Sequence, residues 1–216
     1  MSGVNINKTF RIRFEKVEVA KYISHLDLQR IFSRSLTRSG IKLMYSEGFN
    51  PRPKISFVSA ISLGVESLCE FADIKIAENL TETQVFDKMK NVFPQGINIR
   101  EVYEPETDFK NIDRTKYDIS LKSDGFGVND LDKLFEGDVY FEKKPGVTVN
   151  LKDYVCEMII SDKTGRNIFI YATVKTNPEM FLNPENIIKI ISSKYIIDDY
   201  SIQKIEVYDK NNKIFR

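Results

Sequence analysis

Residues 9–40 have the sequence TFRIRFEKVEVAKYISHLDLQRIFSRSLTRSG, which predicts a strand followed by a helix. Apolar and polar side chains alternate at the start of residues 9–20, as in a half-buried strand. Ser24 precedes Asp27 by three residues, close to a capping box, and Gly40 is suited to end the helix. Helical spacing then predicts an inward stripe, made by Leu28, Ile31, Phe32, Ser35 and Leu36.

The same two patterns continue along the chain. In the first half they predict further strands at 41–45, 54–63, 69–77 and 97–104, and a helix from Thr81 to about Val92. In the second half they predict strands at 115–122, 138–144, 147–160, 167–176 and 202–208, and helices at 129–136 (capped by Asn129) and 185–194. The expected fold is α+β, with two ferredoxin-like modules that have antiparallel sheets. The expected bounds are 1–104 with an inserted Gly/Pro loop, a polar linker at 105–113, and 114–216.

Composition limits the class of protein. A chain of 216 residues suits one large domain or two of about 100 residues. We expect a cytoplasmic protein without a membrane partner, because no apolar run approaches the roughly 18–20 residues of a membrane span and the first residues do not resemble a secretory signal. Cys69 and Cys156 are expected to be buried free thiols. Two cysteines and one histidine predict no metal site and no cofactor.

Charge is distributed unevenly along the chain. The whole chain has a net charge of +1, but the first 64 residues carry 11 basic and four acidic residues, which leaves −6 for the rest. Such asymmetry favours a polyanionic partner. Arg30, Arg34 and Arg38 recur every four residues on a face of the first helix away from its inward stripe. The face that carries these three arginines is either solvated or, together with Arg11 and Arg13, binds phosphate.

The segment Gly48–Lys54 predicts a stiff basic loop. Two prolines in it fix φ and push the residues before them towards extended conformations, while Gly48 permits angles that larger residues resist. The loop would present Asn50, Arg52 and Lys54, which suits contact with an anion. The alternative is a rigid connector with solvated charges.

His25 is the only histidine and stands at the expected start of the first helix. A helix N-terminus favours an anion, so a neutral His25 could act as general base beside a bound phosphate, with Tyr22 nearby. The alternative is a residue of the first turn that packs or caps. Because one histidine supplies only one proton-transfer role, we expect no independent enzyme activity, although the question stays open.

The stretch YISHLDLQRIFSRSLTRSGIKLMYSEGFNPRPKISFVSAISLGVES, residues 22–67, resembles the opening of the radical SAM-linked proteins. This is a bacterial family of unknown function, whose members occur alone or as the C-terminal part of cobalamin-type radical SAM proteins. The later segments KKPGVTVNLKDY and NPENIIKII are also similar. The family often has histidine after the first proline of the loop, where this chain has Arg52. The resemblance implies an accessory protein that works with a radical SAM enzyme.

These observations lead to two functional hypotheses. The first is a non-catalytic accessory module of a radical SAM system that binds RNA through Arg30, Arg34, Arg38, Asn50, Arg52 and Lys54. The second is a metal-independent endoribonuclease with His25 as general base, because paired ferredoxin-like modules and a lone histidine are similar to CRISPR repeat-processing enzymes. The chain lacks the clear Gly-rich loop near the C-terminus that those enzymes normally carry.

Overall fold

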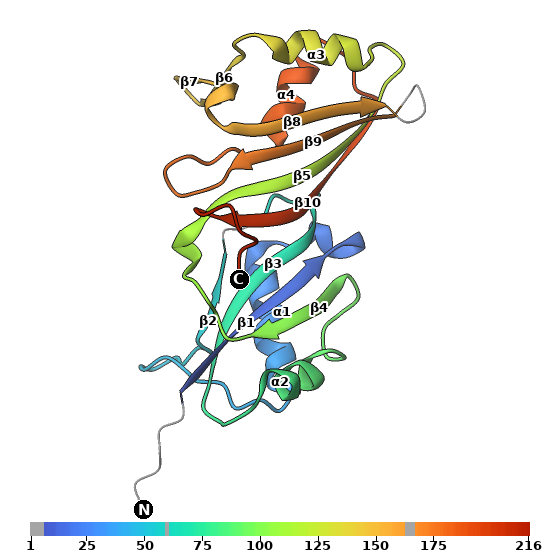
Figure 1. Ribbon diagram of the computed structural model, residues 1–216. Coiled ribbons are helices and arrows are strands. Elements are labelled where there is room, and N and C mark those ends of the chain that lie inside the picture. The colour runs from blue at the N-terminus through green and yellow to red at the C-terminus, as the bar shows by residue number, and fades with distance from the viewer. Residues whose placement is uncertain (1–6, 59–60, 163–166) are drawn as a thin grey trace, which may run out of the picture. The chain divides into compact units, whose positions relative to one another are not determined.

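The computed structural model describes residues 7–58, 61–162 and 167–216. It divides into two compact units, shown in Figure 1. The first module holds the residues up to Asp108 together with Arg216, and the second module is Phe109–Phe215. Part of the segment expected as a linker is regular structure, because it contains the short helix η2 (Phe109–Asn111) and the start of the next strand.

The first module has the order β-α-β-β-α-β. Its elements are β1 (Lys8–Lys16), η1 (Glu18–Tyr22), α1 (His25–Arg38), β2 (Ile55–Phe57), β3 (Glu66–Ile76), α2 (Glu82–Met89) and β4 (Ile97–Tyr103). All strand pairs are antiparallel, and the spatial order is β4-β1-β3-β2. This is the ferredoxin-like arrangement. Both helices pack on one face of the sheet, where the core contains Phe10, Ile12, Phe14, Leu28, Phe32, Leu36, Val85 and Met89.

The second module repeats this order with one addition. Its elements are β5 (Ile112–Lys122), α3 (Val128–Glu136), β6 (Tyr140–Lys144), β7 (Val147–Asn150), η3 (Leu151–Asp153), β8 (Val155–Asp162), β9 (Asn167–Lys175), α4 (Glu185–Ser192) and β10 (Asp199–Asp209). Its strands are ordered β10-β5-β9-β8, again antiparallel. The hairpin β6–β7 is an insertion that pairs only with itself among the described strands. The α+β fold with two ferredoxin-like modules is therefore confirmed.

Local sequence signals place the helix starts. The Ser24 hydroxyl accepts a hydrogen bond from the Asp27 backbone N–H at 3.1 Å, so Ser24 caps α1 as predicted. Thr81 and Gln84 form a capping box at the start of α2. Helix α3 begins earlier than predicted: Gly127 holds the cap position in place of Asn129, because the Asp130 carboxylate accepts from the Gly127 backbone N–H at 2.9 Å.

Three predicted strands differ in the structure. The segment 54–63 is a strand only over Ile55–Phe57, and its positions 59–60 lie outside the described residues. The segment 41–45 forms only isolated bridges, because its partner changes along it: Leu43 pairs with Ile76 of β3, whereas Tyr45 pairs with Pro53 across the following loop. The segment 147–160 is broken into β7, η3 and β8, since the Asn150 side chain accepts from the Lys152 backbone N–H at 3.2 Å and turns the chain. Side-chain capping by asparagine competes with strand continuation in this way.

Cys69 is buried, as predicted, but Cys156 is exposed. Cys156 lies on β8, where its neighbour Val155 lines a cavity against α3. The pairing of β8 with β9 has an irregularity between Val155 and Glu157, so Cys156 lies at a bulge, where alternation does not assign its face. Among the described residues, no helix has the length and apolar character needed to cross a membrane.

Candidate functional site

The loop between α1 and β2 is an ordered hairpin. The Ser46 backbone N–H donates to the Arg52 carbonyl at 2.8 Å, and the Lys54 N–H donates to the Met44 carbonyl at 2.8 Å. The Arg52 N–H donates to the Ser46 hydroxyl at 3.0 Å. Gly48 has φ of +115°, in the region that favours glycine, so it allows the turn at the tip. The predicted stiffness thus has a hydrogen-bonded basis.

The tip of this hairpin is exposed. Phe49 has a relative exposure of 106%, so its ring has no packing partner. Asn50 and Arg52 are exposed beside it. Within the part of the chain that the structure describes, the side chains of Phe49, Asn50 and Arg52 make no hydrogen bond, ion pair or ring contact. The sequence predicts Asn50 and Arg52 as contacts of this loop, and the full exposure of Phe49 makes it the most unusual residue of the loop.

Lys54 is exposed and stands at the base of the hairpin, directly before β2. Its carbonyl accepts from the Lys75 N–H at 3.1 Å, so the pairing with β3 extends to Lys54. The Ile55 N–H donates to the Pro53 carbonyl at 2.9 Å, so the backbone makes a tight turn at Lys54.

The three arginines of α1 differ in their partners. The Arg38 guanidinium donates to the Val92 carbonyl at 2.7 Å and to the Ser35 hydroxyl at 3.0 Å, so it ties α1 to the segment after α2. Arg34 is exposed and has no hydrogen-bond or ion-pair partner among residues 7–58, 61–162 and 167–216. Equal spacing in sequence thus gives one arginine with a structural contact and one available to a ligand.

Arg30 is neutralised by its own helix. Its guanidinium donates to Asp27 at 2.8 Å. Hydrogen bonds from Ser24 and then from Arg30 hold the pKa of Asp27 below its usual value, so the carboxylate stays ionised. This local ion pair reduces the positive charge that Arg30 presents.

The opposite face of the first sheet is not an open basic surface. Arg11 is buried and donates to both carboxylate oxygens of Asp73, at 2.7 and 2.8 Å, and to the Thr107 carbonyl at 2.8 Å. Arg13 forms an ion pair with Glu101 at 3.8 Å. The charges expected to extend the basic face are therefore paired within the module.

The same sheet face offers no exposed aromatic ring at Phe71 or Tyr103, because both are buried. The Arg216 guanidinium lies 4.6 Å from the centroid of the Tyr103 ring. Burial raises the pKa of Tyr103 to about 12, so its hydroxyl stays protonated at neutral pH. Exposed aromatics on the sheet are what RNA-binding sheets of this class use for stacking. In the first module, Phe49 on the loop is more accessible for that role.

His25 lies at the first turn of α1 and is exposed. Its Nε2 is 3.0 Å from the Gln29 amide nitrogen, which donates because an amide nitrogen has no acceptor capacity. Its ring meets the Phe57 ring edge-on, with 5.8 Å between centroids. Tyr22 is also exposed and lies under the Lys21 ammonium at 5.5 Å. These contacts give His25 a packing role in the first turn, and its basic nitrogen is already engaged.

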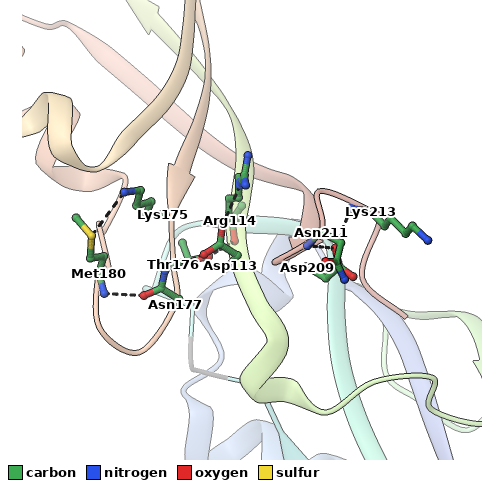
Figure 2. Close-up of polar contacts among 10 residues, drawn as sticks. Asp113, Arg114, Lys175, Thr176, Asn177, Met180, Asp209, Asn211 and Lys213 are labelled. Atoms are coloured by element: carbon green, nitrogen blue, oxygen red, sulfur yellow. Dashed lines mark hydrogen bonds and ion pairs between the residues drawn. The ribbon is translucent and has the colours of Figure 1, made fainter.

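A polar cluster at one end of the second sheet was not predicted. Figure 2 shows it at the start of β5, the end of β9 and the end of β10. The Asp113 carboxylate accepts from Asn177 at 2.9 Å and from Arg114 at 3.0 Å. The Thr115 and Thr176 hydroxyls are 2.8 Å apart. The signal that sequence alone offers is a set of short polar residues just outside predicted strands, which is also typical of ordinary turns.

Each group in this cluster has a partner within it. The Asn177 side chain accepts from the Met180 N–H at 2.7 Å, and Asp209 accepts from the backbone N–H groups of Asn211 and Lys213 (Figure 2). Burial acts to raise the pKa of Asp113, but the hydrogen bonds from Asn177 and Arg114 outweigh it and lower the pKa overall. These side chains therefore close the strand ends and their turns. Among the described residues, no group of three or more His, Cys, Asp or Glu side chains is placed to hold a metal ion.

Comparison with known families decides what kind of chain this is. A family model described as "Uncharacterized protein conserved in bacteria (DUF2344)" matches residues 9–184. The chain belongs to this family. The match begins at the second residue of β1, runs through the rest of the first module to Asp108, and extends into the second module as far as Pro184, directly before α4. No curated protein matches the chain.

Two solved structures illustrate the distant similarity of this family member to other proteins. One is described as an unknown protein from Galdieria sulphuraria, with 10% identity over 92% of this chain and 99% of that chain. Another is the acetolactate synthase small subunit from Thermotoga maritima, with 11% identity over 95% and 98% of the two chains. Both have a TM-score of 0.28. Similarity at this level says nothing about function.

Proposed function

We propose that this protein is a non-catalytic RNA-binding module and that the hairpin loop of residues 44–54 is its principal contact. The observation that carries the proposal is Phe49, a fully exposed ring at the tip of a hydrogen-bonded hairpin beside the unpaired Arg52. An aromatic platform with an adjacent cation is how proteins hold single-stranded nucleic acid. Arg34 on α1 supplies a further cation without an internal partner.

The hairpin suits single strands better than duplexes. A base must be unstacked before it can lie on Phe49, and single-stranded RNA presents such bases at low cost. Stacking of one base contributes about 1–3 kcal/mol. The hydrogen bonds across the loop, together with Pro51 and Pro53, hold the backbone before binding, so less entropy is lost when the complex forms.

The partner protein is proposed from the resemblance of residues 22–67 to the radical SAM-linked proteins. The protein would act in the bacterial cytoplasm and hold RNA for a radical SAM enzyme that carries out the reaction. The net charge of +7 over the first 64 residues supports the RNA contact, and the family description supports only a bacterial protein. This part of the proposal is independent of the RNA contacts and has its own test below.

Fluorescence anisotropy with a labelled single-stranded RNA tests the RNA contact. The wild-type chain should bind at low salt, and log K should fall with log salt at a slope of about −0.7 for each phosphate neutralised. Arg52→Gln should weaken binding and reduce the steepness of this slope by about 0.7. Lys210→Gln, an exposed charge in the second module, is the matched control and should leave the slope unchanged. Absence of binding by the wild type at low salt would reject RNA binding.

Copurification tests the protein partner. Tagged full-length chain should recover a radical SAM protein from its own cytoplasm after nuclease treatment. Recovery only before nuclease treatment would show that RNA bridges the two proteins. Failure in both conditions would reject the accessory role while leaving RNA binding as a separate result.

A further inference from the structure

A cavity of about 410 Å³ lies in the second module between α4 and the inserted hairpin β6–β7. Figure 1 shows this hairpin and α4 in the same module. Tyr140 and Phe141 of β6 line it on one side, and Ile190 of α4 lines it on another. Pockets that bind small molecules commonly have volumes of about 300–1,000 Å³. The cavity is therefore large enough for a compact ligand with an aromatic ring.

Asn186 is the most informative residue of this cavity. It is only 8% exposed and lines the cavity from α4. Its backbone N–H donates to the Asn183 carbonyl, but its side-chain amide has no hydrogen-bond partner among the described residues. Neither polar atom of this amide is among the fully buried side-chain atoms that lack a partner in the described part of the chain, so the Asn186 amide is open to solvent in the cavity. It is therefore available to a ligand that both donates to and accepts from it.

The charged residues of the cavity favour an anionic ligand. Lys189 and Lys194 line it, are exposed, and have no ion-pair partner in the described part of the chain. Of the two acidic residues of the lining, Asp138 forms an ion pair at 4.0 Å with Lys152, which does not line the cavity. The two lysines therefore face one carboxylate, Glu142, which accepts a hydrogen bond from a backbone N–H of the hairpin turn at 2.7 Å.

We propose that this cavity binds a nucleotide. The Asn186 amide would pair with the polar edge of the base, since one acceptor and two donors match the mixed donor and acceptor groups found there. One aromatic ring of β6 would lie against the base, because consecutive side chains of a strand point to opposite faces, and Lys189 and Lys194 would hold the phosphate. A free nucleoside monophosphate and one nucleotide of an RNA share this chemistry. The site is separate from the 44–54 loop in residues and module, so it goes beyond the function proposed above.

Calorimetric titration of the full chain with each of the four nucleoside monophosphates tests the site. At least one should bind saturably, and inorganic phosphate alone should bind more weakly because it lacks the base. Asn186→Leu should weaken binding about tenfold, the equivalent of one lost hydrogen bond to a buried group. It replaces an unpartnered amide with an apolar side chain of similar size, so the fold should be kept.

Two further variants keep the test decisive. Lys189→Gln changes an exposed residue and should weaken nucleotide binding without affecting stability. Lys133→Gln, on α3 and outside this cavity, is its matched control and should bind like the wild type. The proposal is overturned if none of the four nucleotides binds at millimolar concentration, or if binding is unchanged in both Asn186→Leu and Lys189→Gln.

Competition distinguishes the two sources of the nucleotide. The Arg52→Gln chain lacks a proposed loop contact but keeps the cavity. If single-stranded RNA displaces the bound nucleotide from this chain, the site takes a nucleotide of RNA. If it does not, the ligand is a free nucleotide. If the wild-type chain binds nucleotide but no RNA, the proposed function is rejected and this inference stands. If it binds RNA but no nucleotide, this inference is rejected and the proposed function stands.

Discussion

Both modules carry an insertion at the same topological position, between the first helix and the second strand, yet the two insertions differ. In the first module it is residues 41–54, held by isolated bridges and backbone hydrogen bonds around a Gly/Pro tip. In the second module it is the regular hairpin β6–β7. The first presents an exposed ring and cation to solvent, whereas the second lines a cavity together with α4.

The difference teaches what topology does and does not determine. The strand order determines the end of the sheet at which the insertion lies. In both modules the chain runs from the first helix to the start of the second strand, and the insertion lies in that connection. The side chains of the insertion decide whether it extends outward or encloses space. Two prolines and Gly48 favour a stiff tip, while β6 and β7 alternate as strands do and can pack on one side. Function must therefore be argued separately for each module.

The largest expected effect is on the free energy of unfolding and concerns a polar pair of side chains in each module. The first module uses the buried pair Arg11–Asp73, and the second uses the neutral Thr115–Thr176 pair. Asp73→Ala should lower the free energy of unfolding by about 3–5 kcal/mol, because it leaves Arg11 charged and buried. Urea unfolding of the full chain measures this.

Glu101→Ala is the control for that prediction. Glu101 pairs with Arg13 at 3.8 Å and is partly exposed, so its loss should cost at most about 1 kcal/mol. Equal effects of the two substitutions would show that the buried pair does not distinguish the first sheet from the second.

The next effect sharpens the contrast between the two insertions. Phe49→Ala should weaken binding of single-stranded RNA by about 1–3 kcal/mol, the contribution of one stacked base. Stability should change by less than about 0.5 kcal/mol, since the ring has no packing partner. Anisotropy and thermal melting measure the two quantities. A large loss of stability with unchanged RNA affinity would make the loop a structural element.

A smaller effect depends on pH and belongs to the second module. The pKa of Asp113 is lowered in the folded chain, so the unfolded chain takes up the proton first as pH falls. The stability that ionised Asp113 gives the folded chain is fully present above the ordinary aspartate pKa of about 3.9. It is lost as the pH falls from there through the pKa of Asp113 in the folded chain. Asp113→Ala should therefore cost about 1–2 kcal/mol at pH 7 and less near pH 3. Melting temperatures at both pH values check this, with exposed Asp153→Ala as the control. A pH-independent difference would contradict the assigned ionisation.

The smallest expected effect concerns catalysis. The only histidine is in the first module, so histidine-based RNA cleavage would be confined to that module. We expect the wild-type chain and His25→Ala to leave RNA equally intact in EDTA, because Gln29 already occupies the basic nitrogen of His25. Gel analysis after long incubation measures this. Metal-independent cleavage that disappears in His25→Ala would instead favour the endoribonuclease hypothesis.

Local signals in the sequence predicted much of the fold. Alternation in residues 9–16 and the cap at Ser24 are decided by neighbours within a few positions, so they could be recognised without tertiary information. The break after Asn150 was missed because an apolar alternating run hid a side-chain cap. Cys156 was misjudged because it lies at a bulge of β8, which apolar neighbours in sequence do not reveal.

By itself the sequence determined the two modules, their helix starts and the stiff loop with Gly48, because these depend on short-range spacing, backbone angles and hydrogen bonds. Only the tertiary structure decided which charges are available. Arg38 is held by the carbonyl of Val92, 54 positions away, and Arg11 by Asp73. Arg34 has the same local pattern as Arg38 but no such contact among the described residues. The cavity at Asn186 likewise exists only where β6 meets α4. Charge pairing and enclosure require atoms brought together from distant parts of the chain, and no local pattern encodes them.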